Sequence, residues 1–130
     1  MFLDIRKIEI GERTNVNFGS LIDGRGEGIK ISHDVDIAPQ VNIWSLEHDP
    51  VSANHESRSS KVIIGHHVWI ANRAIILPNT VVESGAVIGA GAVVKGLIKK
   101  NTLNVGNPAR VNKSRSFDPI FKLRKIRRFR

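Results

Sequence analysis

A six-residue period of β-branched aliphatic residues constrains the fold of this chain more than any other feature of its sequence. Counted in steps of six, with three interruptions, the units begin at Ile10, Val16, Ile22, Ile31, Ile37, Ile43, Ile64, Ile70, Ile76, Val82, Ile88, Val94 and Val105. A fixed short period is the signature of a repeat architecture, in which each unit stacks on its neighbours. A step of six cannot keep apolar residues on one face of an α-helix, because the helical period is about 3.6 residues. The alternative is an ordinary β-sandwich with loose alternation.

Stacking gives each unit the burial that it cannot achieve alone. A stacked unit places its Ile or Val above the one a full turn earlier, so the aliphatic side chains form a continuous core. Three units per turn make a three-sided solenoid of short parallel strands, with successive turns about 4.8 Å apart. Small or β-branched residues recur at the fifth place of the unit, where the chain is expected to turn. The sequence therefore predicts an all-β solenoid.

Three interruptions of the period predict surface loops. The step from Ile22 to Ile31 is nine residues, and the step from Val94 to Val105 is 11 residues. The longest step, from Ile43 to Ile64, is 21 residues. We expect a protruding loop at about residues 48–61, and such loops are where binding and catalytic residues concentrate.

The composition indicates one soluble domain. A chain of 130 residues suits a solenoid of roughly four turns, expected over residues 1–113. It has no cysteine, which excludes disulfides and thiol catalysis. We find no secretory signal and no run of 18 apolar residues, so the expected location is the cytoplasm.

The net charge of +8 is concentrated in a C-terminal tail, residues 114–130. The tail has seven basic residues and one acid, Asp118. Its apolar residues Ile120, Leu123, Ile126 and Phe129 recur at steps of three, which predicts a short basic helix that contacts an anionic membrane surface. The alternative is a solvated terminus without specific contacts. Nucleic acid is a poorer partner, because aromatic residues that stack on bases are few.

Two motifs resemble those of a known family. The segment from Ile64 to Ala71 reads IGHHVWIA, and the end of the repeat, from Val105 to Val111, reads VGNPARV. With the repeat, over about residues 8–113, they resemble the left-handed β-helix hexapeptide acyltransferases. The most similar members are O-acetyltransferases of the maltose and galactoside type and of polysaccharide biosynthesis. The resemblance implies a left-handed β-helix, acetyl-CoA as the acyl donor, no metal, and a homotrimer with active sites between subunits.

By the same resemblance, His48 is the catalytic base. In that family a histidine followed directly by proline opens the protruding loop. Here the segment reads LEHDP, so one residue, Asp49, lies between the histidine and the proline. A sugar hydroxyl is a poor nucleophile, and a neutral imidazole can accept its proton during attack. Backbone N–H groups, expected at Ala71 and Asn72, stabilise the oxyanion. Glu47 or Asp49 is expected to orient the ring, and the sequence does not choose between them.

The resemblance assigns the acceptor and the coenzyme to two sets of residues. Small residues let the thin coenzyme arm approach the wall, and basic residues pair with its phosphates, although each is also typical of a solvated surface. For the acceptor set, the alternatives are that its Asn and Asp only form turns, which these residues favour, and that its Trp is an ordinary surface residue. The acceptor set is Asn17, Asp23 and Trp44, and the coenzyme set is Trp69, Ala71, Asn72, Ala90, Lys95, Arg110 and Lys113. The other four histidines, His33, His55, His66 and His67, are expected to be solvated.

Two departures from the family pattern affect these assignments. Relatives that act on small free sugars carry an additional N-terminal helical segment that helps to bind the acceptor, whereas this chain starts almost at the first unit. The acceptor is therefore left open. Where relatives have Thr-Lys, this chain has Lys95 followed by Gly96, which shifts the positive charge by one residue.

Three other functions are compatible with the repeat. N-acetylation of an amino-sugar nucleotide is the nearest, because an amine needs less help from a base. Metal-dependent hydration, as in γ-type carbonic anhydrases, needs three converging histidines. Adjacent His66 and His67 are expected to point to opposite faces of a strand, which disfavours such a site. The third alternative is a non-catalytic scaffold.

Overall fold

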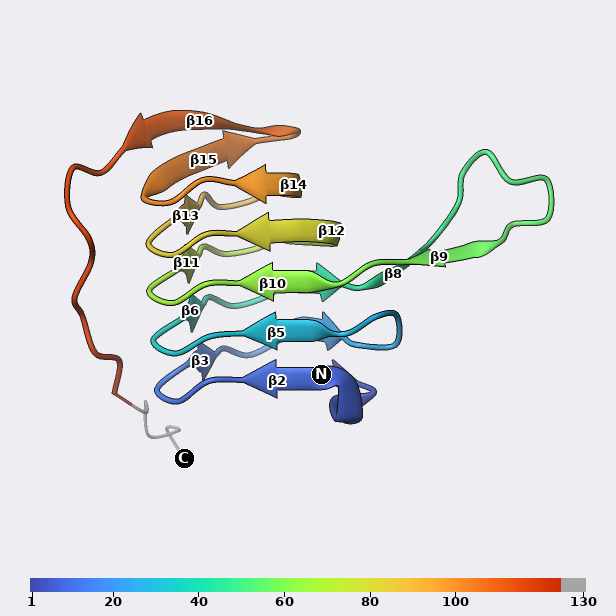
Figure 1. Cartoon of the computed structure of the whole chain (residues 1–130), viewed down its shortest axis with the longest axis horizontal. Helices are drawn as coiled ribbons and strands as arrows, with labels where there is room; N and C mark the ends of the chain where they lie inside the picture. Colours follow the sequence, from blue (N-terminus) through green and yellow to red (C-terminus); the bar gives the residue numbers. More distant parts are fainter. Residues whose placement is uncertain (125–130) are drawn as a thin grey trace.

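The computed structural model describes residues 1–124, and these form a three-sided parallel β-solenoid with one protruding arm (Figure 1). The predicted left-handed β-helix is confirmed. Among residues 1–124, the only helical element is a 3-10 turn, η1 (Ile5–Lys7). In this part of the chain no helix has the length and apolar character needed to cross a membrane.

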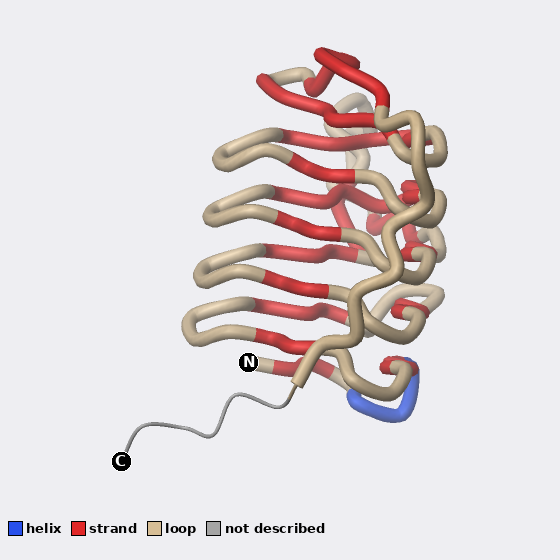
Figure 2. The backbone as a smooth tube through the Cα atoms, turned by 90° about the vertical axis from the view of Figure 1, so that its left-hand side faces the viewer, coloured by secondary structure: helices blue, strands red, loops and turns tan. Residues whose placement is uncertain are grey.

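Parallel strands stack into three faces, which Figure 2 shows from the side. Face 1 contains β2 (Ile8–Ile10), β5 (Ile29–Ile31), β10 (Val62–Ile64) and the second halves of β12 (Ile75–Val82) and β14 (Val93–Ile98). Face 2 contains β1 (Phe2–Leu3), β4 (Leu21–Asp23), β7 (Asn42–Trp44) and the first halves of β12 and β14. Face 3 contains β3 (Asn15–Val16), β6 (Asp36–Ile37), β11 (Trp69–Ile70), β13 (Val87–Ile88) and β15 (Thr102–Gly106). The antiparallel strand β16 (Ala109–Ser114) pairs with β15 at the end of the solenoid.

The strand register reproduces the six-residue period. On face 2, for example, Ile22, Ile43 and Ile76 lie one above another. Most residues that begin a unit are buried in one continuous core: Ile22, Ile31, Ile37, Ile43, Ile64, Ile70, Ile76, Val82, Ile88 and Val94. Val16 is half-buried against that core, whereas Ile10 in the first turn is 40% exposed.

The last unit departs from the expected register. Val105 was expected to face inward, but it is 39% exposed, and the residue stacked on Ile88 is Asn104. The physical reason is a shortened corner: β14 pairs Val94 with Ile76 and then Gly96 with Thr80, so it has fewer residues than β12. Ile98 consequently stacks on Val82. The prediction of a protruding loop between Val94 and Val105 is wrong, because β14 and β15 occupy most of this segment.

Asn104 can be buried because its amide is hydrogen bonded. Its Nδ2 donates to the Thr102 hydroxyl at 2.9 Å and to the Thr102 carbonyl at 3.2 Å. A buried amide without such acceptors would cost free energy. The terminal turn is therefore closed by a small polar network instead of an aliphatic side chain.

One corner of the solenoid carries a ladder of residues in the left-handed conformation. This corner, between faces 1 and 3, is called the strap corner, and its left-handed residues are Arg13, Asp34, His67, Gly85 and Asn101. Only one of the five is a glycine, although non-glycine residues rarely adopt positive φ. Asn and Asp tolerate this conformation because their side chains bond locally.

Residues 115–124, here called the strap, run back along this corner across several turns, as Figures 1 and 2 show. The contacts are from Arg115 N–H to Asn101 O (2.7 Å), Arg115 Nη2 to Gly85 O (2.7 Å), His67 Nε2 to Phe121 O (2.9 Å), and Leu123 N–H to Asp34 Oδ1 (3.0 Å). The helix expected for the tail is therefore wrong over residues 115–124, because the backbone bonds to the corner instead of to itself. The expected helical positions Ile126 and Phe129 lie outside the described residues.

Candidate active site

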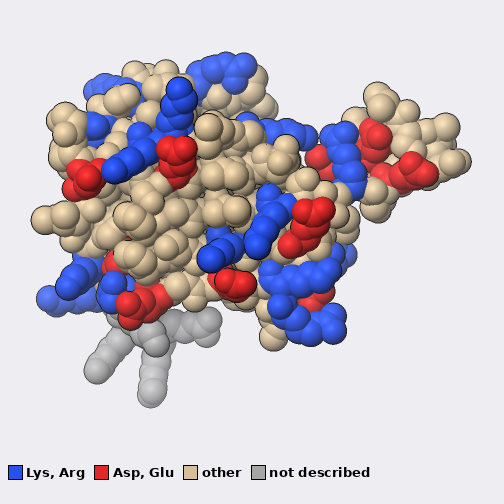
Figure 3. Space-filling model, in the orientation of Figure 1, with Lys and Arg blue, Asp and Glu red and all other residues tan. Residues whose placement is uncertain are grey.

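An arm leaves the corner between faces 2 and 1, where the sequence predicts the long loop. It is a hairpin of β8 (Leu46–His48) and β9 (Ser57–Ser59), paired antiparallel. The arm projects away from the solenoid wall (Figure 1). Its charged residues include both signs, and Figure 3 shows Lys or Arg beside Asp or Glu around its root. The arm presents an ordered strand, with His48 at the end of β8, rather than an irregular loop.

His48 is exposed, and its ring is held by His55. The Nδ1 atom of His48 lies 2.9 Å from the His55 carbonyl oxygen, and the two rings stack with centroids 3.7 Å apart. A carbonyl can only accept, so this contact places the proton of a neutral ring on Nδ1 and leaves Nε2 with a free lone pair. The ring is therefore oriented by a backbone carbonyl at the far end of the arm. The expectation that the carboxylate of Glu47 or Asp49 holds the ring directly is wrong, since these carboxylates pair with Arg58 and Lys95.

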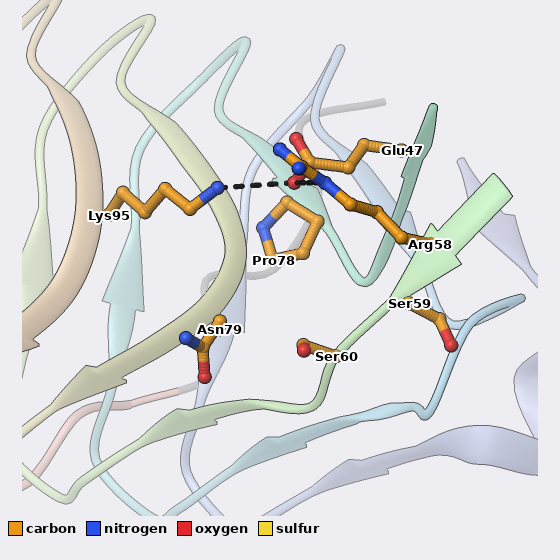
Figure 4. A pocket seen from close by; sticks show the side chains of 7 residues that line it. All are labelled: Glu47, Arg58, Ser59, Ser60, Pro78, Asn79 and Lys95. Atoms are coloured by element: carbon orange, nitrogen blue, oxygen red, sulfur yellow. Dashed lines mark hydrogen bonds and ion pairs between the residues drawn. The ribbon is translucent and has the colours of Figure 1, made fainter. Parts of the chain in front are cut away.

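Glu47 instead joins the arm to the solenoid. Its Oε1 accepts hydrogen bonds from Arg58 Nε at 2.9 Å and from Lys95 Nζ at 3.2 Å (Figure 4). Partial burial raises the pKa of Glu47, but the hydrogen bonds from Lys95 and Arg58 outweigh it and hold the pKa below its usual value. A cavity of about 230 Å³ lies beside this cluster, and Ser59, Ser60, Pro78 and Asn79 complete its lining.

The arm root is tightly packed against the turn below it. Gly26 N–H donates to the Ser45 hydroxyl at 3.0 Å, and the same hydroxyl donates to Asp23 O at 2.7 Å. A Cβ at Gly26 would overlap the carbonyl oxygen of Ser45. The glycine is therefore required by the close approach of two backbones, at the point where the arm begins.

Replacing Gly26 with alanine is expected to lower the free energy of unfolding by about 1–3 kcal/mol, since an added methyl group in a packed site forces backbone shifts. Thermal or urea unfolding measures the change. Gly89→Ala is the matched control: its Cβ would meet mainly the exposed Val105 side chain, which can move aside. Equal losses in the two variants would contradict the packing argument.

A groove of about 630 Å³ runs along the corner between faces 3 and 2. Phe18, Pro39, Gln40, Asn72, Arg73, Ala90 and Gly91 line it, so it crosses successive turns of the solenoid. Two residues of the expected coenzyme set, Asn72 and Ala90, lie in this groove, whereas Ala71 is buried beside it. The Ala71 N–H donates to Ile88 O at 2.9 Å and is used by the strand ladder. Of the two expected oxyanion donors, this leaves the Asn72 amide.

The expected acceptor residues lie at two different corners. Asn17 precedes the groove residue Phe18, and its Nδ2 donates to Ile37 O at 2.7 Å. Asp23 and Trp44 are neighbours in register on face 2, directly before the corner that carries the arm. Asp23 is buried, and the hydrogen bonds from the Arg25 guanidinium lower its pKa.

The remaining coenzyme candidates lie outside the groove. Trp69 is 47% exposed and lines a separate cavity of about 200 Å³ with Asp36 and strap residues Arg115, Phe121 and Leu123. Arg110 and Lys113 are exposed on β16. Lys95 lies at the arm root, paired with Glu47. Within one chain, the expected coenzyme residues are thus divided among four places.

Three histidines meet at the strap corner. The rings of His33 and His66 stack with centroids 5.0 Å apart, and the Nδ1 atoms of His66 and His67 are 2.9 Å apart. The expectation that His66 and His67 point to opposite faces of a strand is wrong, because both lie in a turn. Burial and the neighbouring His67 and His33 lower the pKa of His66. In residues 1–124, no cluster of three or more His, Cys, Asp or Glu side chains has the arrangement of a metal site.

The fold and the repeat define the class of the protein: it is a hexapeptide-repeat left-handed β-helix. Residues 61–96 match the family described as bacterial transferase hexapeptide (six repeats). The chain is 35% identical over 99 residues to a putative lipopolysaccharide biosynthesis O-acetyl transferase of Escherichia coli K12. The matched region covers 67% of this chain and 50% of that protein. It is 34% identical over 120 residues to an E. coli dTDP-4-amino-4,6-dideoxy-D-glucose acyltransferase, covering 84% of this chain and 62% of the relative.

A solved structure agrees with these relatives. The chain superposes on a galactoside acetyltransferase in complex with coenzyme A with a TM-score of 0.82 and 32% identity, over 87% of this chain and 57% of that one. The resemblance to the hexapeptide acyltransferases, indicated by the sequence motifs, is therefore confirmed. This chain spans 50% and 62% of the length of the two curated relatives.

Sequence reasoning missed the residues that organise the arm. The roles of the His55 carbonyl and of the pair Glu47 and Arg58 depend on hairpin register, in which Glu47 lies opposite Arg58 and His48 opposite Ser57. The available signal was the charge pattern, since opposite charges are favourable directly across an antiparallel pair. It was hidden because the segment was expected to be a loop.

Proposed function

We propose that this chain transfers an acetyl group from acetyl-CoA to a hydroxyl group of a sugar or saccharide intermediate, with His48 as the general base. The observation that carries the proposal is the fixed ring of His48, whose Nδ1 contacts the His55 carbonyl at 2.9 Å. That contact leaves Nε2 exposed and ready to accept a proton. The relatives named for O-acetyl transfer and for coenzyme A binding support the reaction class.

In the proposed reaction, His48 Nε2 takes the proton of the acceptor hydroxyl while the hydroxyl oxygen attacks the thioester carbonyl carbon. The carbonyl oxygen becomes an oxyanion, for which the Asn72 N–H is the expected donor. The C–S bond then breaks, and the proton on the imidazole passes to the leaving thiolate. No covalent enzyme intermediate is required, because coenzyme A is already a good leaving group.

The groove at Asn72 and Ala90 suits the thin arm of the coenzyme. The groove follows the solenoid axis and has a volume of about 630 Å³. At the end nearest the terminal hairpin it is lined by the small residues Ala90 and Gly91. The terminal hairpin carries Arg110 and Lys113, and its strand β15 stacks on β13, which leads to Ala90. We place the coenzyme phosphates near that hairpin, where charge-assisted hydrogen bonds are strong.

The arm and the groove emerge from different corners of one chain, with face 2 between them. His48 projects away from its own wall, so a complete site requires the groove of a second copy. With the trimer that the sequence resemblance implies, we propose a homotrimer with active sites between subunits. Sedimentation velocity measures the oligomeric state. The cytoplasmic location and a membrane contact of the basic tail stay predictions.

An acceptor screen tests the proposed function. The protein is incubated with acetyl-CoA and candidate acceptors, including nucleotide-linked and lipid-linked sugars, and release of free thiol is followed. The proposal requires acceptor-dependent thiol release. Calorimetry with acetyl-CoA alone separates an enzyme that lacks its acceptor from a scaffold, because a scaffold would not bind at millimolar ligand.

N-acetylation of an amino-sugar nucleotide is the second candidate. It is favoured by the relative named for dTDP-4-amino-4,6-dideoxy-D-glucose, which this chain matches over 120 residues. An amine needs less general-base assistance than a hydroxyl. The loss of activity on removing His48 is therefore expected to be smaller with amino-sugar acceptors than with hydroxyl acceptors.

Replacing Ala90 with tryptophan is expected to raise the KM for acetyl-CoA at least about tenfold, because loss of about 1.4 kcal/mol of binding free energy already has that effect. The bulky side chain would fill the groove that Ala90 lines. Glu27→Trp, at an exposed position outside the groove, is the control. An unchanged KM in the Ala90 variant would mean that the donor binds elsewhere.

A further inference from the structure

Among the residues that the structure describes, one ion pair joins the hairpin to the solenoid wall, and it lies between Glu47 and Lys95. Glu47 belongs to β8, and Lys95 belongs to β14, on the wall itself. Arg58 of β9 bonds the same carboxylate oxygen, so one carboxylate joins both strands of the arm to the wall (Figure 4).

The geometry points to Glu47 as a positioning residue for His48, with Lys95 as its anchor on the solenoid instead of a ligand of the coenzyme phosphates. The inference rests on the proposed function, since it concerns the same base. Glu47 and His48 are consecutive on a strand, so their side chains point to opposite sides of the hairpin. When Lys95 holds Glu47 toward the wall, His48 is turned away from it, toward the space that a neighbouring copy would occupy.

The charge distribution supports an anchor. Glu47 is 24% exposed on its side chain, and its carboxylate sits between two cations that approach from different elements. Arg58 Nη1 also lies 3.6 Å from Asp49 Oδ1, so Arg58 contacts both Glu47 near the root of the arm and Asp49 beyond the end of β8. The contact with Glu47 occupies one of the three N–H donors of Lys95 and places a carboxylate beside its charge, which makes this corner less favourable for a coenzyme phosphate.

The anchor also explains why a hairpin this exposed keeps one orientation. An isolated two-stranded hairpin is marginally stable in water. At the root, Ser60 N–H donates to Ser45 O at 3.1 Å, and the Ser45 hydroxyl bonds Gly26 and Asp23. Beyond the root, the Glu47 cluster is the contact that we expect to set the direction of the arm. A change of direction at the root displaces His48 at the end of β8, and a shift of about 1 Å in a reacting group can cost roughly 100-fold in rate.

The test compares Glu47→Gln, Lys95→Met and the double variant with the wild-type protein. We expect each single variant to lower kcat roughly 10- to 100-fold, with the KM for acetyl-CoA unchanged. The double variant should be no worse than the more damaged single variant, because both substitutions remove the same contact. Lys95→Arg keeps the cation and is expected to retain most of the activity. A partly exposed pair contributes little to stability, so all four variants should remain folded.

Hydrogen exchange of the β8 and β9 amides provides a readout that does not need activity. We expect faster exchange in this hairpin in all three loss-of-contact variants, with β5 and β10 unaffected. Unchanged exchange in the arm overturns the anchor. Faster exchange with an unchanged kcat overturns the positioning role.

A different kinetic pattern would also overturn the inference. If Lys95→Met raises the KM for acetyl-CoA while Glu47→Gln leaves it unchanged or lowers it, Lys95 is a phosphate ligand. If the wild-type protein transfers no acetyl group to any acceptor, the proposed function fails. In that case the exchange experiment still decides whether Glu47 anchors the arm.

Discussion

Replacing His48 with alanine is expected to lower the kcat for acetyl transfer to a hydroxyl acceptor by about 10²- to 10⁴-fold, the usual contribution of a general base. The structure makes the expectation specific, because the Nδ1 atom of His48 is held at 2.9 Å by the His55 carbonyl and only Nε2 is free to act. The affinity for acetyl-CoA should be unchanged, since the groove at Asn72 and Ala90 lies at another corner. Steady-state kinetics and calorimetry measure the two quantities.

The control for this variant is His66→Asn, which removes an exposed histidine from the strap corner. Its kcat should stay close to that of the wild-type protein. A second comparison uses His55→Asn, because asparagine tolerates the positive φ of 53° at this position and keeps the carbonyl. Retained activity in His48→Ala with hydroxyl acceptors would remove the basis of the proposed mechanism.

Replacing Asp34 with asparagine is expected to lower the free energy of unfolding by about 2–4 kcal/mol, because the Arg13 guanidinium loses its buried charged partner. The Asp34 side chain is 1% exposed and accepts from Arg13 Nε at 2.9 Å and Arg13 Nη2 at 2.8 Å. It also contacts His33 Nδ1 at 2.8 Å and accepts from the Leu123 N–H of the strap. Asparagine has nearly the same shape and suits the φ of 54°, so the substitution removes the charge and one of the two acceptor oxygens without changing the backbone.

The same residue sets a pH dependence. The hydrogen bond from Arg13 is the largest cause that holds the pKa of Asp34 well below its usual value of 3.8. Because the pKa is lower in the folded than in the unfolded protein, the stabilisation is fully present above the unfolded value. It is lost as the pH falls through the folded value. The stability difference between wild-type protein and Asp34→Asn should therefore be constant near neutral pH and shrink below about pH 4.

Asp36→Asn is the matched control for this prediction. Asp36 lies two residues away and is half-buried, but burial raises its pKa, so its charged form is not favoured by the fold. Its replacement by the neutral amide should leave stability nearly unchanged or slightly increased. Urea unfolding of the three proteins at several pH values checks both statements. A loss at Asp36 as large as that at Asp34 would show that the ion pair is not the cause.

The site was predictable from the sequence in its positions more than in its contacts. The long step between Ile43 and Ile64 correctly placed an excursion of the chain, and His48 lies on it. The arm's internal order was not predictable, because the pairing of Glu47 with Arg58 depends on a hairpin register that turn signals in this segment did not specify. The partner of Lys95 could not be read either, since 48 residues separate it from Glu47.

The last turn shows where periodicity alone misleads. Val105 fits a pattern of aliphatic residues, but a corner shortened at Gly96 moves the register, so Asn104 faces inward instead. A step of six identifies an inward residue only while each corner keeps the same length. The strap is a second case: apolar residues at steps of three in the tail are typical of a helix, but the carbonyl and amide groups of residues 115–124 find partners along the corner.

The sequence by itself determined the solenoid, because burial of β-branched residues at a fixed spacing requires stacked turns whatever the rest of the chain does. It also determined where the wall must open, since extra residues cannot be stored in a packed core. The tertiary structure decided which side chains meet at the corners. Those contacts join residues from different turns, and their partners depend on corner length, hairpin register and the path of the strap, none of which leaves a periodic trace in the sequence.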